Sequence, residues 1–151
     1  MHTRHPFDIA TFKLAYAHPA NPAAGEGYAI PIPVNCRIEI TSADFTFTSG
    51  AAVADRLVYV APSVAAAPNQ HFNSPRIQVA NAPTNYHFFT GAPAEAGLAP
   101  VPLEVTAPLG VSCIFDNLTA IIITAQNIQA ADQFSNLFIW YRIWIGGTFP
   151  V

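Results

Sequence analysis

Apolar residues recur at every second position along most of this chain, and prolines separate the segments in which they do so. Between Cys36 and Ile40 the even-numbered residues are apolar, and after Ser42 the phase flips, so that from Ala43 to Phe47 the odd-numbered ones are. A two-residue period places alternate side chains on opposite faces of a strand. The chain is therefore expected to fold into sheets whose strands each have one buried face.

The same period predicts most of the other strands. Phe7–Tyr16 alternates, with a change of phase near Ala10–Thr11 that suits a bulge or bend. Two stretches, Ser49–Asp55 and Gln129–Ser135, have room for a short helical turn, and no long amphipathic helix fits anywhere. Further strands are predicted at Arg56–Ala61, Arg76–Ala80, Asn85–Thr90, Val101–Thr106, Val111–Phe115, Thr119–Ala125 and Leu137–Ile145.

Proline decides how these strands are connected. The chain has 14 prolines, concentrated between the predicted strands. Because proline lacks an N–H, it is disfavoured in helix interiors and in central strands of a sheet. Long, stiff connectors favour the crossing connections of Greek keys and jelly rolls over simple hairpins. We therefore predict one all-β domain, residues 1–151. It is an antiparallel β-sandwich of jelly-roll or Greek-key type with 8–10 strands and an extended N-terminal arm of about residues 1–8.

Charge is scarce in this chain. Charged residues make up 10% of it and hydrophobic residues 52%, whereas about a quarter of an ordinary soluble domain is charged. A net charge of −3 with one lysine argues against direct nucleic-acid binding, which needs clustered basic residues. A surface with so few charges tends to associate, so we expect a homo-oligomer.

The apolar runs do not predict a membrane protein. Each is far shorter than the roughly 20 residues of a membrane-spanning helix, and the N-terminal residues lack the apolar segment of a secretory signal. We therefore expect no membrane insertion, no signal peptide and synthesis in the cytoplasm.

Two predicted strands are apolar on both faces. Ala120–Thr124 has the pattern of a strand that is covered on both sides. The last strand places one alternating set in the predicted core: Leu137, Ile139, Tyr141, Ile143 and Ile145. Its opposite face is the candidate site, and it carries Phe138, Trp140, Arg142 and Trp144.

Three interpretations of this second face remain open at the level of the sequence. The N-terminal arm or a proline-rich loop can cover it as a second small core. It can instead be an interface with another protein, because Trp, Tyr and Arg are enriched where proteins bind partners. It can also be a platform for a sugar, although the sequence places no converging carboxylate or amide beside it. In each case the Arg142 guanidinium is within reach of both indoles.

No set of residues predicts catalysis or metal binding. The five histidines lack metal-ligand spacing, and Cys36 and Cys113 form no CxxC pair, so we expect two buried thiols. A hydrolase built on Cys113 would need a base such as His87, but the mid-strand context of Cys113 favours inert packing. We predict no enzyme, no cofactor and no metal.

Several features together resemble those of a class of viral proteins. They are the all-β pattern with connectors rich in Pro, Ala and Asn, the near absence of lysine, the N-terminal arm and the long hydrophobic last strand, Leu137–Ile145. In these the chain resembles small jelly-roll virion structural proteins, such as the minor capsid, vertex and decoration proteins of bacteriophages and other viruses. The resemblance implies a place in the virion and partners that are copies of the chain and other capsid proteins. It implies no functional residue, and the alternative is a lectin-like carbohydrate-binding β-sandwich module.

Overall fold

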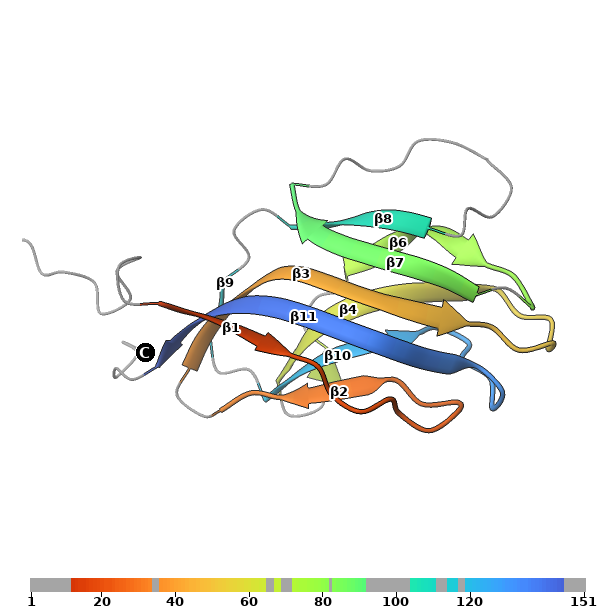
Figure 1. The fold of residues 1–151 in the computed structure, drawn as a ribbon, viewed down its shortest axis with the longest axis horizontal. Helices are drawn as coiled ribbons and strands as arrows, with labels where there is room; N and C mark the ends of the chain where they lie inside the picture. The colour runs from red at the N-terminus through yellow and green to blue at the C-terminus, as the bar shows by residue number, and fades with distance from the viewer. Residues whose placement is uncertain are drawn as a thin grey trace, which may run out of the picture.

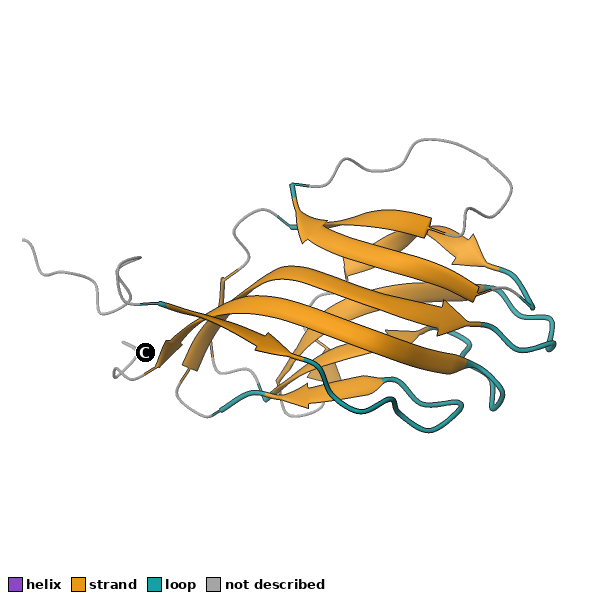
Figure 2. Cartoon of the chain, viewed as in Figure 1, coloured by secondary structure: helices purple, strands orange, loops and turns teal. Residues whose placement is uncertain are grey.

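The chain folds into two β-sheets that lie face to face (Figure 1). The computed structural model describes residues 12–33, 36–64, 67–68, 72–81, 83–91, 104–110, 114–116 and 119–145. Within these ranges the regular elements are all strands (Figure 2), which confirms the prediction of an all-β sandwich. The expected N-terminal arm of about residues 1–8 lies outside the described residues.

The larger sheet, sheet A, has six strands. In spatial order it contains β1 (Lys13–Ala17), β11 (Gln133–Ile145), β3 (Cys36–Thr48), β7 (Pro83–Thr90) and β8 (Glu104–Leu109), while β9 (Ile114–Asp116) also pairs with β3. Its pairs are antiparallel except for β7 and β8, which run parallel. That parallel pair was not part of the predicted antiparallel arrangement.

The smaller sheet, sheet B, has five strands. In spatial order it contains β2 (Tyr28–Pro31), β10 (Ala120–Ala125), β4 (Arg56–Val64) and β5 (Ala67–Pro68), and β6 (Phe72–Gln78) also pairs with β4. The alternating pattern did not predict β2 or β5, because both are short and contain proline.

Four antiparallel ladders are nested within one another. β1 pairs with β11, β2 with β10, β3 with β7, and β4 with β6. The first four of these strands therefore pair with the last four in reverse order, as in one long hairpin folded over on itself. Two further antiparallel ladders, β3 with β11 and β4 with β10, join the pairs into sheets.

The phase flip in β3 is a β-bulge. The ladder with β11 passes from the Ser42–Trp140 pair directly to the Ile40–Tyr141 pair, so that Thr41 is the additional residue. The Thr41 hydroxyl donates a hydrogen bond of 2.9 Å to the Trp140 carbonyl. Because of the bulge, the alternate residues from Cys36 to Ile40 and from Ala43 to Phe47 all point into the core, as their spacing predicts.

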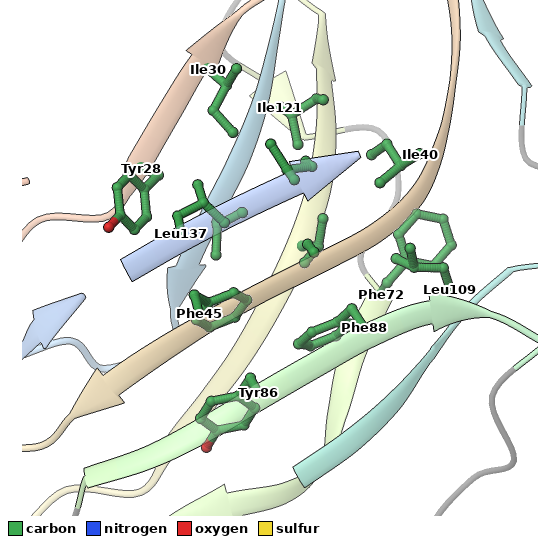
Figure 3. Packing of buried hydrophobic residues seen from close by; sticks show 14 of the residues in the cluster. Tyr28, Ile30, Ile40, Phe45, Phe72, Tyr86, Phe88, Leu109, Ile121 and Leu137 are labelled. Atoms are coloured by element: carbon green, nitrogen blue, oxygen red, sulfur yellow. The ribbon is translucent and has the colours of Figure 1, made fainter. Parts of the chain in front are cut away.

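The core between the sheets is rich in aromatic rings (Figure 3). The fully buried Phe134 packs among three of these rings, with ring-centroid distances of 4.4 Å to Phe47, 5.7 Å to Phe45 and 6.2 Å to Tyr28. The β10 residues Ile121 and Ile123 are also fully buried. Ile122, on the opposite face of β10, is only partly buried, so this strand is not covered on both sides as its composition led us to expect.

A buried ion pair stands at one end of the sandwich. The fully buried side chains of Arg56 and Asp132 meet at 2.6 Å between Nε and Oδ2. The Asp132 carboxylate also accepts hydrogen bonds from the backbone N–H groups of Gly50 and Gln129. Arg56 donates to two carbonyls of the β3–β4 loop.

The expected short helical turns do not extend into helices in Ser49–Asp55 and Gln129–Ser135. In the second stretch the Asp132 N–H donates to the Gln129 carbonyl and closes a single turn, and β11 begins directly after it at Gln133. The Gly25 N–H, in the β1–β2 loop, donates to the Asp132 carbonyl at 2.7 Å. Arg56 and Asp132 thereby tie three loops together.

We expect this ion pair to make stability depend on pH in the acid range. Burial alone would raise the pKa of Asp132, but the hydrogen bonds from Arg56, Gly50 and Gln129 and the charge of Arg56 together hold the pKa below its usual value. A depressed pKa stabilises the fold above the unfolded-state pKa of about 3.9. That contribution is lost as the pH falls through the lower folded-state value. Urea unfolding between pH 7 and pH 2 measures this loss, and an Asp132→Asn variant should lack that component.

The two cysteines do not both lie in the described part of the chain. Cys36 is buried, and burial raises its pKa. Cys113 lies outside the described residues.

Candidate functional site

The four candidate residues of the last strand share the outer face of sheet A, which points away from sheet B. They differ in exposure along β11. Phe138 and Trp140 are 45% and 39% exposed, whereas Trp144 is 3% exposed. Arg142, between the two tryptophans, is partly exposed. On the opposite face of β11, Leu137, Ile139 and Ile143 are buried, as predicted.

β1 lies beside this face, a pairing that the sequence did not predict. It pairs along β11 as the edge strand of sheet A and brings its aromatic residues beside those of β11. Ring centroids lie 5.7 Å apart for Phe12 and Trp144, 5.3 Å for Tyr16 and Trp140, and 4.0 Å for His18 and Phe138. Cross-strand aromatic pairs of this kind stabilise a two-strand contact.

β1 does not act as a cover over the face. Its side chains continue the face sideways, with Leu14 at 61% and Tyr16 at 63% exposure. We call the set formed by Leu14, Tyr16, Phe138 and Trp140 the aromatic strip. The alternation of Phe12, Leu14 and Tyr16 was the available signal for it, but a period cannot show which strand lies alongside.

Arg142 is held by an acidic residue of the next strand. Its Nη1 donates to Glu39 Oε2 at 2.8 Å, and Glu39 is largely buried. The guanidinium lies over the Phe12 ring at 5.2 Å from the centroid. The sequence had placed it only within reach of the two indoles. The charge on this part of the face is thus paired within the sheet.

A hydrogen-bonded pair lies further across the same face. His87 Nδ1 and Asp44 Oδ1 are 2.8 Å apart, and both side chains are partly exposed. Phe89 follows on β7, 40% exposed. The face therefore combines exposed aromatic groups with the Arg142–Glu39 ion pair and the His87–Asp44 hydrogen bond. Glu39 and Asp44 are the carboxylates that the sequence could not place beside the last strand.

The Trp144 indole is buried without a hydrogen-bond partner for its Nε1 among the described residues. Phe12 packs against the ring at the end of β11. Trp144 therefore belongs to the packing of this end of the sheet, and the exposed part of the candidate face begins at Trp140.

The remaining candidates for chemistry do not come together in the described ranges. His87 is paired with Asp44, and its suggested partner Cys113 lies outside those ranges. No three His, Cys, Asp or Glu side chains of the described residues are placed to share a metal ion. None of the described segments forms a helix long and apolar enough to span a bilayer.

Comparisons of the chain with protein-family models, with curated proteins and with solved structures found no match.

Proposed function

We propose that this protein is a structural assembly protein, a capsid-associated virion component that acts through contacts with copies of itself and with other capsid proteins. The observation that carries the proposal is the exposed aromatic strip on the outer face of sheet A. Large exposed apolar groups that adjoin one another are typical of surfaces that bind partners.

The charges on the face support burial against a protein. Arg142 is already paired with Glu39, and the His87 ring is hydrogen-bonded to Asp44. An unpaired charge buried at an interface costs several kcal/mol, whereas a pair completed within one subunit leaves no lone charge behind. Aromatic side chains surrounded by satisfied polar groups are the usual composition of a binding hot spot.

The strand order supports the jelly-roll part of the proposal. The nesting of the four ladders agrees with a jelly roll, a sandwich common in viral capsid and lectin domains. Since the architecture serves both classes, the composition of the exposed face has to distinguish between them.

We expect the purified chain to be larger than its 16.2 kDa monomer in size-exclusion chromatography with multi-angle light scattering at micromolar concentration. Trp140→Ser should weaken association by about 30-fold or more, the effect of losing one hot-spot residue. Ile77→Ser is the matched control, because Ile77 is an apolar residue of sheet B that is even more exposed than Trp140. A wild-type protein that stays monomeric throughout would refute the proposal.

The lectin-like module is the alternative, and the adjacent exposed rings of Tyr16 and Trp140 favour it. Flat aromatic rings can stack on sugars, and Asp44 lies on the same face. A glycan array separates the two proposals. Binding by a monomeric wild type that is lost in Trp140→Ala would favour the lectin-like module, and its absence in an oligomeric wild type favours the assembly protein.

A further inference from the structure

We propose that two copies of this chain pair through their β1 edges, antiparallel about a two-fold axis beside Ala15, so that sheet A continues from one copy into the other. The inference rests on the proposed function, because it names the partner and the geometry of that assembly. It follows from the protection of the sheet edges, from the direction of the β1 backbone, and from the distribution of charge.

β1 is an unusually unprotected edge in this sandwich. The strands β2, β5, β6 and β8 lie at or near the other edges, and each contains a proline, at Pro31, Pro68, Pro75 and Pro108 respectively. Proline and very short strands are common devices against pairing between molecules. β9 has no proline but only three residues, whereas β1 has five residues, no proline, and one neighbour among the described strands.

The contact at the β3 bulge shows which backbone groups of β1 are unused by the sheet. The Trp140 carbonyl accepts from Thr41 and so points toward β3, away from β1. Tyr16 is the β1 partner of Trp140. In an antiparallel ladder such a pair exchanges no hydrogen bonds, so the N–H and C=O of Tyr16 point to the open side.

The same alternation applies to Leu14, which lies two residues earlier. The His18 ring supports this alternation. Its Nδ1 donates at 2.6 Å to the carbonyl of Leu137, so the backbone groups of this odd-numbered residue of β11 point toward β1. The side chains of Leu14 and Tyr16 thus lie on the outer face of sheet A, and their unused backbone groups point sideways from its open edge.

A two-fold axis lets Leu14 and Tyr16 of one copy pair with Tyr16 and Leu14 of the other. With Ala15 opposite the partner's Ala15, Leu14 stands opposite the partner's Tyr16, and each such pair makes two backbone hydrogen bonds. Their exposed side chains would meet on one face and extend the aromatic strip across the axis.

The exposed charges favour an antiparallel pair over a parallel one. Lys13 is exposed at the end of the sandwich where β11 finishes, as its pairing with Ile143 shows. With the axis beside Ala15, an antiparallel pair places Lys13 opposite the uncharged Ala17 of the partner subunit, whereas an in-register parallel pair would place the two Lys13 residues side by side.

The test is made on the full chain with Leu14→Pro. Proline removes an outward N–H that β11 does not use, and the loss of two hydrogen bonds per dimer corresponds to a rise of about 30-fold in Kd. Leu14→Thr keeps the N–H and is the matched control, with a much smaller rise expected. Sedimentation equilibrium measures both, and circular dichroism checks that each variant keeps the sheet signal.

Cross-linking tests the register independently. Facing residues of a non-hydrogen-bonded antiparallel pair have Cα atoms about 4.5 Å apart, a distance that a disulfide spans. Ala15→Cys should therefore give a disulfide-linked dimer with diamide as oxidant, whereas Ala17→Cys and the wild type should not.

Each outcome separates this inference from the proposed function. An oligomeric wild type whose Leu14→Pro variant stays equally associated, or whose Ala15→Cys variant does not cross-link, would overturn the β1 pairing and leave the assembly function standing. A wild type that is monomeric at every concentration would overturn both.

Discussion

Asp132→Ala is expected to destabilise the protein by about 3–5 kcal/mol, the usual cost of leaving one member of a buried ion pair without its partner. Arg56 would stay fully buried with an uncompensated charge. The N–H groups of Gly50 and Gln129 would also lose their acceptor. Urea unfolding at pH 7, followed by tryptophan fluorescence, measures the free energy of unfolding.

The control for this prediction removes both charges together. In the double variant Arg56→Met and Asp132→Leu, no charge is left buried, so the loss of stability should be smaller than in Asp132→Ala. If Asp132→Ala alone cost less than about 1 kcal/mol, the two side chains would not hold the loops in the way that their contacts indicate.

Phe134→Ala is expected to cost about 3–5 kcal/mol, which is typical when a buried phenylalanine is truncated and leaves a cavity. The fully buried Phe134 ring packs against three other aromatic rings of the core. Since these rings belong to β2 and β3, the cavity would loosen the contact between the two sheets. The same urea unfolding measurement applies.

Phe138→Ala is the matched control, because it makes the same substitution four residues further along β11, on the opposite face. Phe138 is largely exposed and stacks on His18, so the loss should be about 1 kcal/mol or less. Comparable losses in the two variants would contradict the assignment of the faces. Under the proposed function, Phe138→Ala should weaken association while Phe134→Ala weakens folding.

The strands and their buried faces follow from the sequence because side-chain alternation is a local property. The flip after Ser42 correctly predicts both buried sets of β3. The pairing of Phe138, Trp140, Arg142 and Trp144 on one face of the last strand follows from the same rule. Proline was a poor guide to the connectors, because six of the nine prolines in the described ranges lie within strands: Pro31, Pro62, Pro68, Pro75, Pro83 and Pro108.

The period of two determines which residues share a face, and it carries no information about which strand lies next to which. That decision belongs to contacts between residues far apart in the chain, such as Glu39 with Arg142 and Tyr16 with Trp140. The sequence by itself determined that the chain forms sheets with an aromatic outer face on its last strand. Only the tertiary structure decided that β1 lies beside that strand and leaves the face open, because ladder formation depends on the nested pairing of the whole chain.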